Sequence, residues 1–394
     1  MNNSEKALAC INDEEVIQLT REMVAIPSIT HREGSGMVNF LARWFNDLKI
    51  PVRLYPCHGD RAHLFADYGS VEGPGRFIFN GHQDTKPVDG MTIDPFGAEI
   101  RDGRMYGRGA CDMKGAIAGF LCAFKALVRA GIKPKGGISF FSDFEEEYGG
   151  PDGFLSIIDR GLINGYEGLI SGEPTEMQIH IGNMGSIATA FECRGKKAHA
   201  SLPHLGINAI HNMARFITEY LKLPYCREEN PYFGKPTVNF EKITEGEHTW
   251  SSVPDYCLVC LDTRLIPETP PDKVRRQLDE LLHRMSVDYG ADIHEIDPPK
   301  TWRPKKGGAA AAYIPPDHPL TLRVMDAFRR ATGREAVIAA LPGATLAGVM
   351  IRKGLPSIIC GPGSIRQAHT EDEWVEVAQI PEAARVYTML MSEM

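Results

Sequence analysis

Residues 81–147 contain three turns that carry an imidazole or carboxylates, and these turns read Gly81-His82-Gln83-Asp84, Ala110-Cys111-Asp112-Met113 and Glu145-Glu146-Glu147-Tyr148. Each turn follows an apolar, strand-like run. Polar groups at the ends of neighbouring parallel strands meet at one edge of a sheet, where open α/β sheets assemble metal and ligand sites. The stretch therefore predicts a largely parallel sheet with a metal site at one edge.

The pattern around this stretch alternates between strands and helices. Strand-like runs occur at 77–80, 138–142, 168–171 and 357–360, and helical spacing of apolar residues occurs at 13–24, 113–130, 318–331 and 380–391. This alternation indicates an α/β fold, with a mostly parallel sheet flanked by helices. Asn12 and Asp13 are the N-cap candidates of the first helix, and Gly131 is expected to end the helix at 113–130. An apolar stripe with Phe40, Trp44 and Phe45 predicts a further helix whose aromatic residues lie in the core.

From residue 182 the pattern changes, and it returns near residue 299. Residues 182–298 contain β-rich runs and two helical segments, which indicate an α+β domain. We expect this domain to be inserted into a catalytic metal-binding domain formed by residues 1–181 and 299–394. The run 307–312, which contains only glycine and alanine, is expected to be a flexible connection.

The composition argues against several classes of partner. The chain of 394 residues has a formal net charge of −8 and no run of Lys and Arg, so we expect no binding to nucleic acid or to an anionic membrane. No apolar stretch is long enough to span a membrane, and no signal-peptide pattern is present, so we expect a cytoplasmic protein. The pair Cys257 and Cys260 fits reduced core thiols better than a zinc knuckle.

Several polar residues in these turns suit metal chemistry. His82 and Asp84 lie two positions apart on one face of an extended segment, so Asp84 is placed to accept the second ring N–H of His82. Asp112 alone fits a helix N-cap as well as a ligand. The adjacent carboxylates at 145–147 repel one another unless they are solvated or bind cations, and Glu173 adds another carboxylate at a fourth strand end. With a later histidine, this set suits two divalent ions that share one carboxylate, and it leaves one glutamate as a base.

Five motifs extend this pattern over nearly the whole chain, at 81–84, 107–115, 146–149, 171–175 and 368–370. In order and in residue type they resemble the metal-dependent aminoacylase, deacetylase and carboxypeptidase family. The run Gly172-Glu173-Pro174-Thr175 is most similar to the branch of acetylornithine deacetylase and succinyl-diaminopimelate desuccinylase. The resemblance implies a zinc-exopeptidase-like fold and one or two divalent ions per subunit, with Zn²⁺ favoured and Co²⁺ or Mn²⁺ as alternatives.

The resemblance also implies a role for each polar residue. Asp112 is implied to bridge two ions, and the other ligands are His82 and Glu173 on one ion and Glu147 and His369 on the other. Glu146 is implied to be the general base, although a shift of the turn by one residue would make Glu145 the base and Glu146 the ligand. The family also carries a cis peptide bond after its bridging aspartate, which corresponds here to Asp112–Met113.

The expected inserted domain resembles the family's lid and dimerisation module at 195–201 and 206–210. The resemblance implies that His199 reaches the active site of the partner subunit and stabilises the oxyanion. It therefore implies a homodimer formed through this domain. Arg264 is implied to help bind a substrate carboxylate.

Some positions that face the substrate in the family differ in this chain. Met184-Gly185 stands in place of Arg-Gly, Ser251 in place of an asparagine, and Thr345 in place of an aspartate. We expect Ser251 and Thr345 to contact the substrate. Lys86 replaces a residue that is usually apolar, and points either toward the pocket or into solvent.

These differences leave the reaction class better defined than the substrate. The resemblance implies hydrolysis of an amide C–N bond, in an N-acyl amino acid or a small peptide-like substrate, by a metal-activated water. Because residues that orient an amino acid are changed, hydrolysis of a non-amide C–N bond, such as removal of a ring amine, is the alternative.

Overall fold

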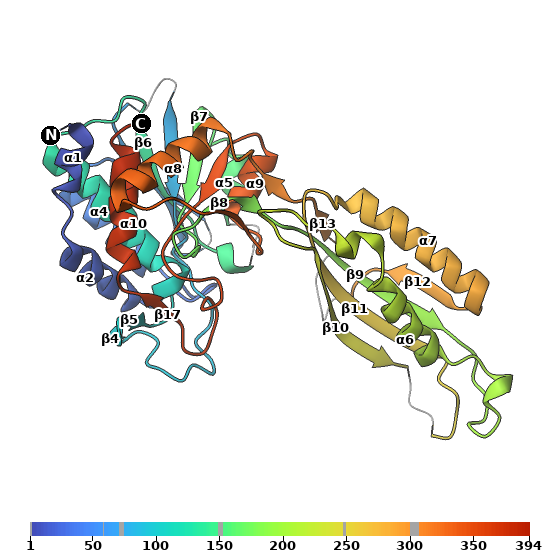
Figure 1. Ribbon diagram of the computed structural model, residues 1–394. Helices are drawn as coiled ribbons and strands as arrows, with labels where there is room; N and C mark the ends of the chain where they lie inside the picture. The colour runs from blue at the N-terminus through green and yellow to red at the C-terminus, as the bar shows by residue number, and fades with distance from the viewer. Residues whose placement is uncertain (1, 58, 71–74, 149–152, 247–249, 300–306) are drawn as a thin grey trace. The chain divides into compact units, whose positions relative to one another are not determined.

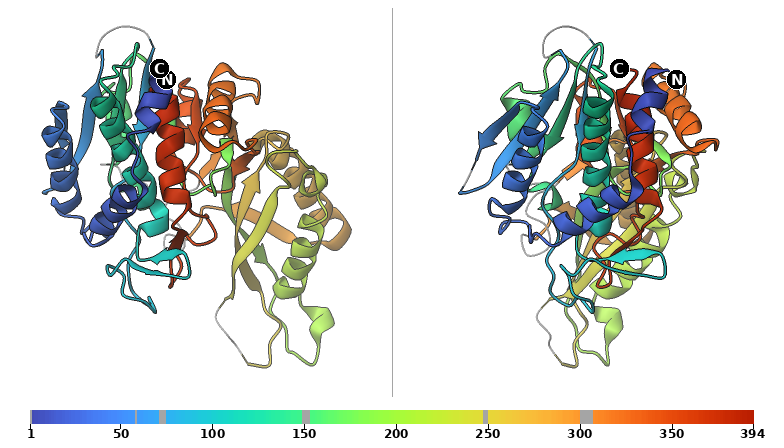
Figure 2. Two further views of the ribbon diagram at one scale, coloured as in Figure 1. Left: turned by 60° about the vertical axis from the view of Figure 1, so that its left-hand side comes forward. Right: turned by 90° about the vertical axis from the view of Figure 1, so that its left-hand side faces the viewer.

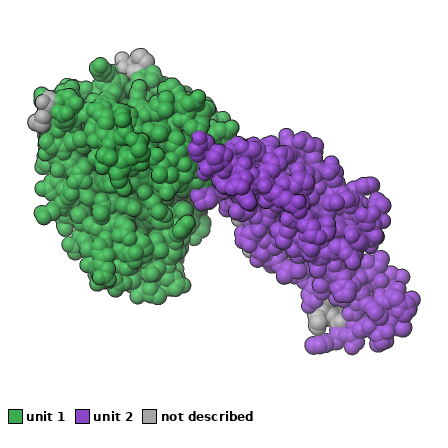
Figure 3. Space-filling model, in the orientation of Figure 1, with its two compact units in different colours: residues 1–182, 313–341, 345–394 green, residues 183–312, 342–344 purple. Residues whose placement is uncertain are grey.

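The computed structural model describes residues 2–57, 59–70, 75–148, 153–246, 250–299 and 307–394. The chain forms two compact units (Figure 3). The first unit comprises Met1–Gly182, Tyr313–Leu341 and Thr345–Met394, and the second comprises Asn183–Ala312 with Pro342–Ala344. The second unit extends further along the chain than the expected 182–298. The position of the two units relative to each other is not determined.

The first unit is built on a nine-stranded sheet (Figure 1). Eight strands follow in the spatial order β1 (Val52–Pro56), β2 (Ala62–Tyr68), β6 (Ile138–Ser142), β3 (Arg76–Asn80), β7 (Tyr166–Ser171), β16 (Ser357–Ile359), β8 (Ile179–Asn183) and β14 (Ala312–Tyr313), and β15 (Ile338–Leu341) pairs with β8. The neighbours β6, β3, β7 and β16 run parallel, whereas β1–β2, β2–β6 and β16–β8 are antiparallel pairs. The parallel strands expected from the sequence thus form the centre of a wider, mixed sheet.

Helices pack on both faces of this sheet, which confirms the α/β class. They are α1 (Asn3–Leu8), α2 (Asp13–Val24), α3 (Gly36–Asp47), α4 (Gly115–Ala130), α5 (Phe154–Asp159), α8 (Pro319–Thr332), α9 (Leu346–Arg352) and α10 (Gln379–Met391). Successive side chains of a strand point to opposite faces. On β6, Phe140 therefore packs against Phe45 of α3, whereas Phe141 joins the cluster that α5 and α9 cover. Figure 2 shows α4, in teal, and α10, in red, side by side on the first of these faces.

The ends of two helices follow the sequence signals. The Asn12 side chain accepts a hydrogen bond from the backbone N–H of Glu15 at 3.0 Å, so Asn12 rather than Asp13 caps α2. Gly131 ends α4 with φ +67°, a conformation that suits glycine. Helix α4 begins at Gly115 rather than near residue 113, because Asp112 and Met113 have non-helical backbone angles. The expected cis peptide bond is present between these two residues.

A small three-stranded sheet joins two distant parts of the first unit. Strand β17 (Trp374–Glu376) pairs antiparallel with β5 (Arg104–Tyr106), which pairs antiparallel with β4 (Glu99–Arg101). This pairing brings the segment that follows His369 alongside the loop that precedes Asp112.

The second unit is an α+β module with a five-stranded antiparallel sheet. Its strands are β10 (Thr237–Glu245), β11 (Tyr256–Leu265), β9 (Gly185–Arg194), β12 (Asp292–Ile296) and β13 (Gly307–Ala309), with β12 and β13 both paired to β9. The helices α6 (Ala209–Tyr220) and α7 (Pro271–Tyr289) cover one face (Figure 1). Cys257 and Cys260 are buried thiols on β11, as expected. The run 307–312 is not simply a flexible connection, since it forms β13 and the start of β14.

Within the described residues, none of the helices combines the length and the apolar character that crossing a membrane requires.

Candidate metal centre

Four adjacent parallel strands deliver most of the predicted site residues to one edge of the large sheet. Each strand ends shortly before a polar residue: β3 before His82, β6 before Glu146 and Glu147, β7 before Glu173, and β16 before the loop with His369. Asp112 comes from the turn Ala110–Lys114, at the start of α4. The order of the strands in the sheet therefore brings residues that are distant in sequence into one cluster.

Two glycines allow this edge to close tightly. A Cβ atom on Gly361, which follows β16, would lie 2.1 Å from the carbonyl oxygen of Gly172, which follows β7. A Cβ atom on Gly172 would lie 2.6 Å from the Cβ of Ala116 in α4. Glycine at both positions lets the end of β7, which carries Glu173, approach β16 and α4.

Asp112 lies between the two predicted histidine ligands. Its Oδ1 is 3.0 Å from His82 Nε2, and its Oδ2 is 3.2 Å from His369 Nε2. The same His369 nitrogen is 2.9 Å from Glu147 Oε2, and His82 Nε2 is 4.0 Å from Glu173 Oε2. One carboxylate thus faces both halves of the cluster, which is the arrangement needed for a ligand shared by two ions.

The pKa values of these groups reflect a buried cluster of opposite charges. Burial lowers the pKa of His82, but hydrogen bonds and the neighbouring carboxylates of Asp112 and Asp84 raise it well above 6.5. Burial likewise opposes the shift in His369, whose contacts with Asp112 and Glu147 raise its pKa to about 9. The pKa of Asp112 is lowered, because hydrogen bonds from the two histidines outweigh its burial.

Glu173, Glu146 and one oxygen of Glu147 have few positively charged neighbours. Burial, followed by the nearby charge of Asp112, raises the pKa of Glu173 well above 4.5. Burial is also the main cause that raises the pKa of Glu146 to about 8. Glu147 Oε1 is buried and has no hydrogen-bond partner among the described residues. Divalent cations would supply the missing charge.

The donor atoms fit such ions. Ligand atoms of His82, Asp112 and Glu147 lie within 4.8 Å of one another, and so do those of His82, Glu146 and Glu173. Imidazole nitrogens and carboxylate oxygens are the ligands that Zn²⁺ and related ions take in hydrolase sites. The cluster therefore has the donor chemistry of a site for divalent metal ions.

Asp84 lies beside His82, although its contact differs from the expected one. The backbone carbonyl of Asp84, rather than its carboxylate, accepts the hydrogen bond from His82 Nδ1, at 2.9 Å. The carboxylate Oδ1 is 3.6 Å from this nitrogen, which is too far for a hydrogen bond. Instead, the carboxylate accepts the backbone N–H groups of Glu146 and Glu147 at 3.2 and 3.3 Å. Asp84 thus connects the turn after β3 to the turn after β6.

The three glutamates of the triplet have different surroundings. Glu145 has φ +61° and turns toward Arg61 and His31, with Oε1 at 3.0 Å from a nitrogen of each. Glu147 faces His369, and Glu146 lies in the cluster with His82 and Glu173. This geometry favours Glu146 and Glu147, rather than Glu145 and Glu146, as the pair in the centre. The predicted register of the glutamate triplet used Gly149 as its reference point, and Gly149 lies outside the described residues.

The sequence interpretation missed Glu373, a buried carboxylate that supports Asp112. Its Oε2 accepts from Arg108 at 2.7 Å, and its Oε1 accepts the backbone N–H groups of Gly109, Cys111 and Asp112 at 3.0, 3.0 and 3.1 Å. Burial is the main cause that raises its pKa to about 7. The signal for this residue was weak, because one glutamate among the exposed acids after His369 has no distinguishing pattern.

Lys86 points toward the centre rather than into solvent. Its Nζ lies 3.2 Å from Glu147 Oε2 and also donates to the backbone carbonyl of Glu147. The ammonium lies 4.3 Å from the ring centroid of Tyr148.

The predicted substrate and oxyanion residues are divided between the units. His199, Ser251 and Arg264 belong to the second unit, and Thr345 belongs to the first. His199 forms an isolated β-bridge with Ser252, and the backbone N–H of Ala200 donates to the Ser251 carbonyl at 2.8 Å, so His199 and Ser251 are neighbours. Arg264 Nε lies 2.7 Å from Asp262 Oδ1 on the same strand.

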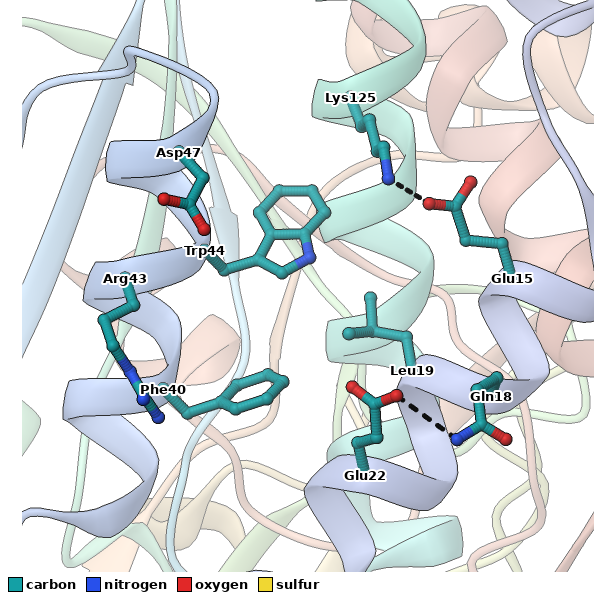
Figure 4. Close-up of a pocket in the computed structure, with 9 residues that line it drawn as sticks. All are labelled: Glu15, Gln18, Leu19, Glu22, Phe40, Arg43, Trp44, Asp47 and Lys125. Atoms are coloured by element: carbon teal, nitrogen blue, oxygen red, sulfur yellow. Dashed lines mark hydrogen bonds and ion pairs between the residues drawn. The ribbon is translucent and has the colours of Figure 1, made fainter.

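A pocket of about 450 Å³ lies away from the centre, between α2, α3 and α4 (Figure 4). Phe40 and Trp44 line it and are half-buried, so these two aromatic residues are not part of the closed core, unlike Phe45. Within the pocket Lys125 pairs with Glu15, and Gln18 donates to Glu22 at 3.2 Å. None of the predicted site residues lines this pocket.

Comparison with known proteins agrees with this geometry. The chain is 30% identical over 386 residues to acetylornithine deacetylase of Yersinia pseudotuberculosis, covering 92% of this chain and 93% of the relative. It is 28% identical over 386 residues to succinyl-diaminopimelate desuccinylase of Bordetella petrii, covering 95% and 96%.

Two solved structures share the fold. Aminopeptidase PepT of Bacillus cereus has a TM-score of 0.76 at 22% identity, with 97% of this chain and 99% of that chain covered. A dinuclear metal-binding peptidase of Bacillus subtilis has a TM-score of 0.66 at 14% identity, with 96% and 97% covered. The sequence model described as peptidase family M20/M25/M40 matches residues 78–393, a range that includes every residue of the cluster. The chain therefore belongs to peptidase family M20/M25/M40.

Proposed function

We propose that this chain hydrolyses an N-acyl amino acid or a small peptide-like substrate at a centre of two divalent ions. Its family and its relatives make it a metal-dependent hydrolase of amide C–N bonds, and they do not favour the alternative of ring-amine removal. The observation that carries the residue assignment is Asp112, whose two carboxylate oxygens face His82 and His369 separately.

The proposed ligands divide into two halves that share Asp112. His82 and Glu173 complete the first half, called the His82 half. Glu147 and His369 complete the second, called the His369 half. Bound ions would polarise the scissile carbonyl and make a water molecule acidic enough to lose a proton at neutral pH. Zn²⁺ is the proposed ion, with Co²⁺ or Mn²⁺ as alternatives, since His and carboxylate donors suit all three.

Glu146 is the proposed general base. Its backbone N–H is held by Asp84 at 3.2 Å, while its carboxylate makes no hydrogen bond or ion pair among the described residues. A carboxylate that is positioned by its backbone but otherwise unengaged can take a proton from water and return it to the leaving amine. His199 is the proposed donor to the developing oxyanion, acting from the partner subunit.

Three residues, Thr345, Arg264 and Ser251, are proposed to bind the substrate. Thr345 Oγ1 is buried without a hydrogen-bond partner among the described residues, so its hydroxyl group is available for a hydrogen bond with a substrate. Arg264 carries a positive charge suited to a substrate carboxylate. Ser251 lies next to His199 in the second unit.

A homodimer through the second unit is also proposed. Exposed apolar residues on this unit support it, notably Ile243 at the sheet edge and Leu221 after α6, which are 59% and 50% exposed. The buried thiols Cys257 and Cys260 support the proposed cytoplasmic location, where thiols stay reduced.

The proposed base is tested by a matched pair of variants. Glu146→Gln should lower turnover of an N-acetyl amino acid by roughly 10²- to 10⁴-fold, because proton transfer is lost. Its metal content, measured by elemental analysis, should equal that of the wild type. Glu145→Gln is the control, and it should retain most of the turnover, because Glu145 faces Arg61 and His31.

The opposite result, an active Glu146→Gln variant and an inactive Glu145→Gln variant, would reverse the register of the triplet. A panel of N-acetyl amino acids, N-succinyl amino acids and dipeptides then defines the substrate. If all of these fail and a ring amine is hydrolysed, the proposed substrate class is wrong.

A further inference from the structure

Three contacts fix the Lys86 ammonium beside one of the proposed metal ligands. The Lys86 side chain is 21% exposed, and its Nζ lies 3.2 Å from Glu147 Oε2. It also donates to the backbone carbonyl of Glu147 and lies over the Tyr148 ring, at 4.3 Å from the ring centroid. The carbonyl and ring contacts do not involve the Glu147 carboxylate. They therefore hold the positive charge in place whether or not that carboxylate binds an ion.

The two halves differ most in the surroundings of one ligand oxygen, Glu147 Oε2. It lies 2.9 Å from His369 Nε2 and 3.2 Å from Lys86 Nζ, so a cation that binds it must share it with an ammonium group. On the other half, His82 Nδ1 donates to the Asp84 carbonyl at 2.9 Å, and the negatively charged carboxylate of Asp84 lies 3.6 Å away. A nearby carboxylate strengthens a histidine ligand, whereas a nearby ammonium repels a dication and reduces the charge on its ligand oxygen.

We propose that Lys86 is a positioning residue that makes the His369 half the weaker of the two metal sites. This inference rests on the proposed ligand set. Lys86 acts as a built-in counter-charge for Glu147, so that the His82 half fills first and the ion of the His369 half is readily exchanged. A single lysine thereby sets the occupancy of one site without being a ligand itself.

The test measures metal binding directly, with no substrate present. Chelator-treated full-length protein is titrated with Co²⁺, and heat and Co²⁺ absorption are followed. The wild type should show a tight and a weak step, and His82→Asn and His369→Asn should each remove one of them. Both Lys86→Met and Lys86→Gln should tighten the step assigned to the His369 half by about tenfold or more, because a full charge is removed at short range.

Two further variants separate charge from general effects on structure. Lys86→Arg keeps the charge and should restore the weak step. Lys133→Met, at an exposed lysine after α4, should change neither step. Lys86→Gln keeps a polar group, so it decides the matter if Lys86→Met does not fold.

Unchanged or weaker binding at the His369 half in Lys86→Gln would overturn the inference, since Lys86 would then support the site rather than oppose it. Equal affinity of the two steps in the wild type would overturn it as well, while leaving the proposed function intact. A wild type that binds no Co²⁺ would overturn both.

Discussion

The two halves of the proposed metal centre differ in how their proposed ligands are supported. In the His82 half, His82 and Glu173 are 2% and 5% exposed, and each follows directly after a central strand of the sheet. In the His369 half, the His369 side chain is 45% exposed and comes from the long loop after β16, with φ +66°. The ends of central strands position the first half and also Glu147 of the second, whereas His369 depends on its loop and on side-chain contacts.

This difference indicates which half of the centre can be altered by residues outside the ligand set. A ligand at the end of a buried strand can hardly change its position without disturbing the core. A ligand on a loop, such as His369, depends on individual contacts, here those with Asp112 and Glu147, and Lys86 contacts the same Glu147 carboxylate. Substitutions outside the ligand set should therefore affect the two halves unequally, and the following predictions test this in order of expected effect.

Replacement of the shared ligand should abolish the distinction between the halves. In Asp112→Asn both histidines lose the charged carboxylate that they share, so both metal steps should disappear and turnover should fall to that of the chelated wild type. Metal content after gel filtration and an amide-hydrolysis assay measure the two effects.

Asp143→Asn is a matched control for that variant. Asp143 is a buried carboxylate that accepts a hydrogen bond from Asn80 at 2.9 Å and does not belong to the ligand set. It should therefore keep both metal steps. If Asp112→Asn still bound two ions, Asp112 would not be the bridge.

Asp84→Asn should weaken metal binding less severely. Its carboxylate holds the backbone of Glu146 and Glu147 and supplies negative charge near His82. Loss of such an outer partner typically costs 10- to 100-fold in metal affinity, so we expect about that decrease. The His82 half should lose the larger share, as measured by the same Co²⁺ titration. A larger loss at the His369 half would mean that the backbone contacts matter more than the charge.

The smallest expected effect is a dependence of stability on pH in the metal-free protein. Contacts with Asp112 and Glu147, opposed by burial, raise the pKa of His369 from 6.5 to about 9 in the folded chain. A group with a raised folded pKa contributes stability below its unfolded pKa, and this contribution is lost as pH rises through the folded value. The melting temperature of the chelated protein should therefore fall between about pH 6.5 and pH 9.

The His369→Asn variant provides the comparison for this pH effect. It lacks the exposed histidine and should show a shallower fall than the wild type. Any fall that persists then comes from buried groups such as His82 and Glu146, whose folded pKa values are also raised. An unchanged slope in the variant would assign the whole effect to those buried groups.

The fold and the strand-borne part of the site could be predicted because local patterns encode them. The apolar runs before His82 and Glu173 indicate strands, and strand ends place their next residues at one edge of the sheet. Apolar runs also indicate β1 and β2, but the antiparallel direction of β1, β2 and β8 could not be predicted, since short apolar runs carry no information on the direction of their neighbours.

The side-chain contacts could not be predicted in the same way. Lys86 and Glu147 are distant in sequence, and no periodicity records that they meet. Asp84 was expected to bind His82 through its carboxylate, because spacing along a strand does not distinguish a side-chain oxygen from a backbone oxygen. Glu373 went unnoticed for a similar reason, as its three amide partners lie in a distant turn.

The place of β16 in the sheet has a consequence for how the chain acquires its shape during synthesis. This strand lies between β7 and β8 in the sheet, and its Ser357 pairs with Leu169 of β7. The whole second unit lies between these two residues in the sequence. Contacts between such distant segments form late, because a long loop must close first. The segment after β16 then supplies both His369 and Glu373. A ribosome-bound chain that ends before this segment can complete the sheet of the second unit, but it cannot yet assemble the metal centre.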